Sequence, residues 1–192
     1  HVYPRRRDWI ERLIEKFEDP DVALVYGKQR GNEETRFSER QVFRRWFPDR
    51  DINHQESPFC NNANAAIRRE LWENYPYNEE LTGLEDLDWA KRLQSDGWEI
   101  SYASEAEIVH VHDETWREVY NRYRREAIAL STILDDQNYT FSDFIRTLSM
   151  NIYEDWKKAI STGDIREYIF DIPKFRFLQF WGTYRGFAYD DS

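Results

Sequence analysis

The chain has 192 residues, 40% of them hydrophobic and 17% aromatic, which is enough apolar material for the core of one ordinary domain. Its net charge of -10, from 27 basic and 37 acidic side chains, argues against binding along the phosphates of a nucleic acid. The one cysteine, Cys60, excludes an internal disulfide, and no apolar run reaches the roughly 18–20 residues that span a bilayer, so we expect a cytoplasmic protein.

The first half of the chain alternates short helices and strands. The apolar face of residues 8–17 predicts a helix with Asp8 as its N-cap. Residues 22–26 predict a buried strand that ends at Gly27, followed by a polar loop over 28–36. The other elements expected in this half are helices at 38–47, 69–73 and 85–94 and strands at 59–67, 98–102 and 107–112.

From Thr115 onward the pattern becomes mainly helical, with further helices expected at 141–160 and within 165–170. The aromatic and basic segment 173–182 either packs against the domain or rests on a membrane surface. Strands mixed with helices, followed by helices alone, predict a partial α/β sheet with a helical appendage.

Three carboxylates in four positions mark the start of the helix expected at 85–94. Glu85, Asp86 and Asp88 follow Gly83 and Leu84. A carboxylate near a helix N-terminus is held ionised by backbone N–H groups, and it can act as a general base. The alternative is that these acids only cap the helix.

Two further groups have the chemistry of a binding site. His110 and His112 alternate along a strand, so both point to one face, where they suit a metal ion or a diphosphate; a structural role is the alternative. Asn61, Asn62 and Asn64 offer donors and acceptors for sugar hydroxyls, although Asn is also a frequent turn residue.

Taken in order, segments 59–68, 83–89 and 109–112 resemble the acceptor half of an inverting, family 2 glycosyltransferase of the GT-A fold. Within that family the chain is most similar to rhamnosyltransferase-like enzymes of bacterial surface polysaccharides. The resemblance implies that residues 1–130 form the C-terminal part of a GT-A domain, without its N-terminal nucleotide-binding strands. Residues 131–192 would then form a helical C-terminal extension, and the chain would be a fragment of a longer protein.

The resemblance also assigns roles to residues. Asp86 matches the catalytic base. The acceptor would be bound by Glu85, Trp89, Asn61, Asn62 and Asn64. A divalent cation, manganese or magnesium, would be held by His112, with His110 and His1 as further ligands.

The partners that the resemblance implies are a nucleotide-diphosphate sugar as donor and a glycan or lipid-linked glycan as acceptor. Peripheral contact with the inner face of the membrane and self-association into a homo-oligomer are further expectations. Two alternatives remain open from sequence. One is a non-catalytic acceptor-binding or scaffolding domain. The other is a metal-dependent hydrolase that uses Asp86, Asp88, His110 and His112.

Overall fold

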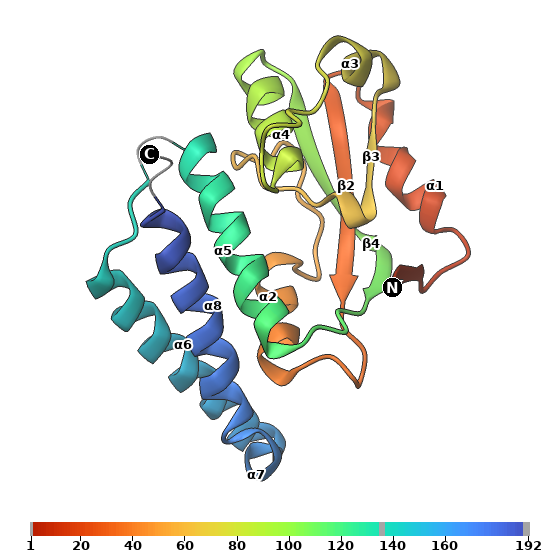
Figure 1. Ribbon diagram of the computed structural model, residues 1–192. Coiled ribbons are helices and arrows are strands. Elements are labelled where there is room, and N and C mark those ends of the chain that lie inside the picture. Colours follow the sequence, from red (N-terminus) through yellow and green to blue (C-terminus); the bar gives the residue numbers. More distant parts are fainter. Residues whose placement is uncertain (1, 135–136, 190–192) are drawn as a thin grey trace. The chain divides into compact units, whose positions relative to one another are not determined.

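The computed structural model describes residues 2–134 and 137–189, and the chain divides into two compact units (Figure 1). The sheet unit comprises residues 1–35, 42–81 and 85–112, and the helical unit comprises 36–41, 82–84 and 113–192. The division falls after His112, whereas we expected a boundary after residue 130. That expected boundary lies inside helix α5 (Trp116–Ile133), which packs along α8 (Asp171–Phe187) and so belongs with the later helices.

The sheet unit is built on four strands in the order β1-β4-β2-β3. β2 (Val22–Arg30) and β4 (Glu99–His110) run parallel in the middle. β1 (Val2–Pro4) pairs antiparallel with β4, and β3 (Ala65–Ile67) pairs antiparallel with β2. The predicted mixture of strands and helices is therefore confirmed as an α/β unit with a mixed sheet.

Both central strands are longer than the sequence pattern predicts. β2 continues through Gly27, and its register with β4 shifts between Gly27 and Gln29. A Cβ at position 27 would collide with the carbonyl oxygen of Ala106 and with the side-chain amide of Asn64. Gly27 therefore allows a close approach within the sheet instead of ending the strand. β4 is likewise one strand where we expected two, at 98–102 and 107–112.

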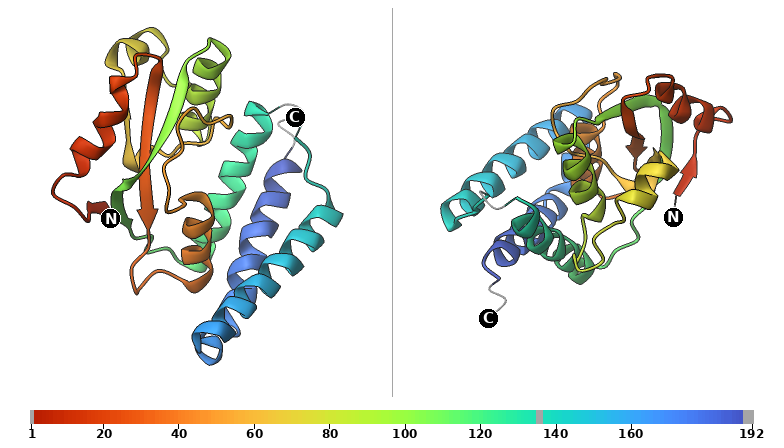
Figure 2. Two further views of the ribbon diagram at one scale, coloured as in Figure 1. Left: turned by 180° about the vertical axis from the view of Figure 1, so that it is seen from behind. Right: turned by 90° about the horizontal axis from the view of Figure 1, so that it is seen from above.

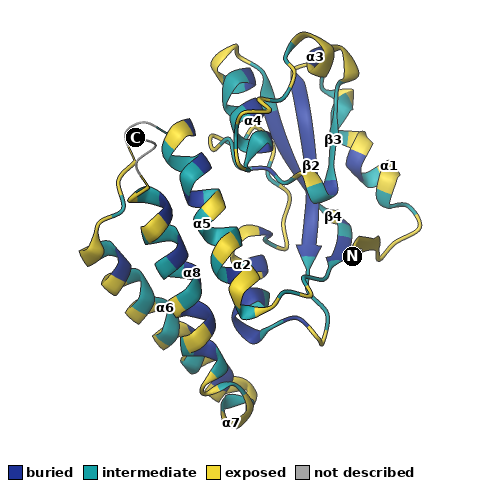
Figure 3. Cartoon of the chain, in the orientation of Figure 1, coloured by how far each residue is buried: buried dark blue, intermediate teal, exposed yellow. Residues whose placement is uncertain are grey.

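β2 is buried along nearly its whole length (Figure 3), and its alternate residues pack against two different helices. Leu24 and Tyr26 pack with Trp89 and Leu93 of α4 (Glu85–Ser95), and Val25 packs with Leu13 of α1 (Trp9–Ile14). Asp8 precedes α1 but makes no side-chain capping bond, because its carboxylate pairs with Arg6 and Arg12 instead. The remaining short elements are η1 (Glu15–Glu18), α2 (Phe37–Trp46), η2 (Asn62–Asn64) and α3 (Arg69–Asn74).

In the helical unit, α8 lies between α5 and α6 (Phe141–Thr162), with the short α7 (Ile165–Tyr168) before it (Figures 1 and 2). α8 includes the whole aromatic segment 173–182, for which we predicted no helix, and continues to Phe187. Phe175 and Arg176 are buried there, so this part of the segment packs inside the protein, while contact of the segment with a membrane stays a prediction. Within the described ranges, no helix combines the length and the apolar character needed to cross a bilayer.

Two glycines let α8 approach α5 closely. A Cβ at Gly186 would lie 2.5 Å from the Cβ of Ala127 and 2.5 Å from the carbonyl oxygen of Arg124. A Cβ at Gly182 would lie 2.7 Å from the carbonyl oxygen of Tyr120. Larger residues at these positions would push the two helices apart.

A buried ion pair joins α8 to α6. Arg176 donates from Nε to Oδ2 of Asp155 at 2.7 Å and from Nη2 to Oδ1 at 2.9 Å, and both side chains are 4% exposed. Its Nη1 donates to Gln179 Oε1 at 2.8 Å. The two-pronged geometry satisfies both carboxylate oxygens, which is what a buried charge pair requires.

Candidate functional site

Asp86 stands in the first turn of α4, directly after a backbone bend. Leu84 has a φ of 57°, in the left-handed region that residues other than glycine seldom adopt. Asp86 is 9% exposed, and its Oδ2 accepts the backbone N–H of Asn62 at 2.9 Å. Its Oδ1 accepts the N–H of Leu87 at 2.9 Å. The carboxylate is therefore held in one orientation by two backbone donors.

The electrostatic surroundings of Asp86 suit a proton acceptor. Burial raises its pKa above the ordinary value of 3.8, and the nearby charge of Glu85 acts in the same direction, while the N–H groups of Asn62 and Leu87 oppose the shift. A carboxylate with a raised pKa is a stronger base than an exposed one. Asp88, one residue beyond Leu87, pairs with Arg92 at 3.0 Å.

The predicted asparagines Asn61 and Asn62 lie beside Asp86. The Asn62 backbone bonds the Asp86 carboxylate, and its side-chain Oδ1 accepts the Tyr77 hydroxyl at 3.1 Å. Asn61 Oδ1 accepts the Ala63 N–H at 3.0 Å and the Gln29 amide at 2.6 Å. The structure therefore brings together two motifs that are more than 20 residues apart in the sequence.

Gln29 connects the asparagines to the histidines. Its Oε1 lies 2.8 Å from His110 Nδ1, and His110 Nε2 lies 3.1 Å from His112 Nε2. With the Gln29 to Asn61 bond this makes a continuous line of polar side chains, which we call the amide–imidazole line: His112, His110, Gln29 and Asn61. Gln29 is 1% exposed, and the sequence pattern did not indicate it as a site residue because residue 29 was expected in a polar loop.

The ring nitrogens of His110 and His112 are suitable ligands for a divalent cation. An amide oxygen can only accept, so the contact with Gln29 Oε1 places a proton on His110 Nδ1 and leaves Nε2 as the nitrogen that can bind a metal. Ligating histidines commonly hold their second ring nitrogen in this way. With its Nδ1 protonated, His110 accepts at Nε2 the hydrogen bond from His112 Nε2, so binding of one ion by both Nε2 atoms requires His112 to carry its proton on Nδ1 instead.

Two predicted site residues, Trp89 and Asn64, lie in the core. The Trp89 ring is completely buried, and its Nε1 donates to the carbonyl oxygen of Tyr75, so it is a core residue and does not face an acceptor. Asn64 is 1% exposed, and its side chain bonds Trp9 and two backbone carbonyls, so it holds the sheet and does not contact an acceptor. Both acceptor assignments are corrected because no surface is left for a ligand. His1 lies outside the described residues. Glu85 is half-buried beside Asp86.

Comparison with known proteins gives two similarities, both to Salmonella enzymes. The chain is 29% identical over 129 residues to the O-antigen chain rhamnosyltransferase RfbN of Salmonella typhimurium, covering 60% of this chain. It is 29% identical over 126 residues to the O-antigen chain rhamnosyltransferase WbaN of Salmonella anatum, covering 59%. These matches support a distant relationship to glycosyltransferases.

The similarity covers 40% of the first relative and 39% of the second, so the chain spans well under half the length of either. No family model matches the chain.

Proposed function

We propose that the sheet unit carries the acceptor side of a glycosyltransferase. The reaction is transfer of a sugar, with inversion, from a nucleotide-diphosphate donor to a glycan hydroxyl during the synthesis of a surface polysaccharide such as O-antigen. The support is the distant similarity to two rhamnosyltransferases together with the convergence of Asp86, Asn61 and Asn62.

In this proposal Asp86 is the general base. The acceptor hydroxyl loses its proton to the carboxylate while its oxygen forms a bond to the anomeric carbon of the donor sugar. The bond from that carbon to the diphosphate breaks, and the diphosphate leaves with the electron pair. Glu85, Asn61 and Asn62 flank Asp86 and would bind hydroxyl groups of the acceptor.

His110 and His112 would hold the divalent cation, manganese or magnesium. A cation of this kind neutralises the charge that develops on a leaving diphosphate. Gln29 fixes the His110 ring for that role through the Nδ1 contact.

We also assign the sheet unit to a partial GT-A fold of family 2, acting at the inner face of the membrane on a lipid-linked glycan. The mixed sheet and the order of the three motifs along the chain support this assignment.

The test is sugar transfer by the full-length natural protein carrying Asp86→Asn, with Asp88→Asn as the matched control. Loss of the base is expected to lower the transfer rate by about 10²–10⁴-fold while leaving the affinity for the donor unchanged. Asp88→Asn alters a neighbouring carboxylate that pairs with Arg92. Its transfer rate is expected to stay within about threefold of wild type, because Asp88 is engaged with Arg92 and is not the proposed base.

Near-normal turnover in the Asp86→Asn protein would overturn the base assignment. Binding of donor and glycan without transfer by the wild type would favour the scaffolding alternative. Metal-dependent hydrolysis without a nucleotide would favour the hydrolase.

A further inference from the structure

The helical unit contains a basic pocket that the proposed function does not use. The pocket has a volume of about 770 Å³, within the usual range for small-molecule sites. It lies along one side of α5, between Thr82 and Tyr189, and all of its residues belong to the helical unit. We call it the α5 pocket, lined by Thr82, Glu114, Glu118, Asn121, Arg122, Arg124, Arg125, Ile128 and Tyr189.

Most of the charges in the α5 pocket already have partners. Arg122 donates to both oxygens of Glu114 and, from Nη2, to Glu39 Oε1 at 2.7 Å. Glu118 accepts the N–H and the hydroxyl of Thr115, each at 2.7 Å, in the capping box of α5. Both glutamates of the pocket lining, Glu114 and Glu118, therefore already have hydrogen-bond partners for their carboxylates.

Arg124 and Arg125 differ from Arg122 in this respect. Among the described residues, no carboxylate lies within 4.0 Å of either guanidinium. The Arg124 guanidinium lies over the Tyr189 ring at 5.0 Å from its centroid, which keeps it in the pocket wall. The backbone carbonyl of Arg125 accepts the Thr82 hydroxyl at 3.0 Å and fixes that turn of the helix. In a chain of net charge -10, two adjacent arginines stand out when the described residues offer neither of them a carboxylate partner.

We propose that the α5 pocket binds a phosphate or diphosphate group. Guanidinium groups present two parallel N–H donors that match phosphate oxygens, and Asn121 adds an amide donor. Ile128 and the Tyr189 ring supply an apolar wall for the organic part of a phosphorylated ligand. The proposal does not depend on sugar transfer, because the pocket shares no residue with the site around Asp86.

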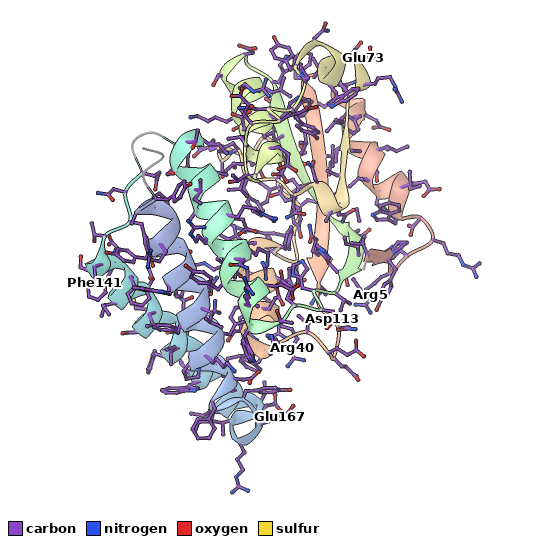
Figure 4. The ribbon with its side chains drawn as sticks, viewed as in Figure 1. Arg5, Arg40, Glu73, Asp113, Phe141 and Glu167 are labelled. Atoms are coloured by element: carbon purple, nitrogen blue, oxygen red, sulfur yellow. The ribbon has the colours of Figure 1, made fainter. Side chains whose placement is uncertain are left out.

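The experiment is calorimetric titration of the full chain with sodium pyrophosphate at two salt concentrations. The test variant is Arg124→Ala with Arg125→Ala. Both substitutions remove exposed or half-exposed side chains and leave the backbone contact of Arg125 in place. The control variant is Lys157→Ala with Arg166→Ala, which removes two exposed positive charges from α6 and α7, the helices labelled at Phe141 and Glu167 in Figure 4.

We expect saturable binding by the wild type that weakens as salt rises. The Arg124 and Arg125 variant should bind at least about tenfold more weakly, since it loses the charge-assisted hydrogen bonds from both guanidinium groups to the phosphate oxygens. The control should stay within about twofold of wild type. Absence of saturable binding to the wild type, or an equal loss of affinity in the test and control variants, would overturn the proposal. If the variant with both Arg124→Ala and Arg125→Ala is unfolded, the Arg125→Ala protein is titrated instead and judged by the same criteria.

A second arm identifies the source of the phosphate. The chain is sedimented with vesicles of phosphatidylcholine containing phosphatidylglycerol, with and without pyrophosphate. Retention that pyrophosphate displaces assigns the site to a lipid headgroup. Pyrophosphate binding without retention assigns it to a free phosphorylated ligand.

Discussion

The two units of this chain connect their interior polar side chains in different ways. In the sheet unit, contacts between neutral amides and imidazoles run from the half-buried His112 and His110 through the buried Gln29 to the half-buried Asn61, although charged side chains such as Lys28 and Asp86 are also buried there. The helical unit buries full charges, and each is matched by an opposite charge, as in Arg176 with Asp155. Neutral groups can exchange partners and protons at little cost, whereas a buried ion loses much of its stabilisation when its partner is removed. We therefore expect removal of one partner to cost more stability in the Arg176–Asp155 pair than in the amide–imidazole line.

The largest expected effect on stability tests the ionic side of this comparison. Asp155→Ala leaves the Arg176 guanidinium buried without its partner, so the free energy of unfolding should fall by about 3–5 kcal/mol. Urea unfolding followed by far-UV circular dichroism measures the change. Glu154→Ala, the exposed neighbour on α6, is the control and should lie within about 0.5 kcal/mol of wild type. A small effect of Asp155→Ala would mean that the pair does not hold the unit together.

A smaller effect is expected when the neutral line is interrupted. Gln29→Leu removes the hydrogen-bond acceptor of His110 Nδ1, so the His110 ring should change from one tautomer to a mixture of two. The affinity of the protein for manganese should then fall by about 10–100-fold. Nitrogen-15 NMR of the imidazoles reports the tautomer directly.

Gln55→Leu is the matched control for Gln29→Leu. Gln55 is another amide of the sheet unit, but it bonds Tyr26 and the backbone at Ser57 and Phe59. An unchanged His110 tautomer in the Gln29→Leu protein would contradict the amide–imidazole line.

The smallest expected effect is a pH dependence of stability at Asp86. Because burial raises the pKa of Asp86 in the folded chain, the folded state favours the protonated form. The contribution of Asp86 to the free energy of unfolding should therefore be largest at low pH. It should fall as the pH rises from the unfolded value of about 3.9 through the raised folded value.

Comparing wild type with Asp86→Asn across this pH range isolates the Asp86 contribution. The variant should become the more stable of the two proteins as the pH increases. A difference that does not change with pH would show that the Asp86 carboxylate is not destabilised by burial.

The sequence predicted the helices better than the contacts between elements. The expected helices at 85–94 and 141–160 match α4 and α6 closely, because both have an apolar stripe, and α6 also has the cap residues Thr140 and Gly163. α8 was missed because its buried face includes the polar residues Arg176 and Gln179, which hide the helical period. Periodicity detects only faces that are apolar.

Part of the site also followed from the sequence. The motifs around Asn61, Asp86 and His110 were recognised separately, but their proximity depends on tertiary contacts that no local pattern contains. Gln29 was invisible because Gly27 looked like the end of a strand. Trp89 was misassigned because a residue close to a functional motif can still face the core.

The order of synthesis on the ribosome has a consequence for the helical unit. Its earliest segment begins at residue 36, and α8 ends at Phe187. At about 5–20 residues per second, roughly 8–30 s separate these two points of the growing chain. Glu39 is 2% exposed in the folded protein, but its ion pair can form only after Arg122 has been synthesised. The close packing of α5 can likewise form only after the glycines of α8 have been synthesised. During synthesis, Glu39 and α5 are therefore present in the nascent chain before their packing partners exist.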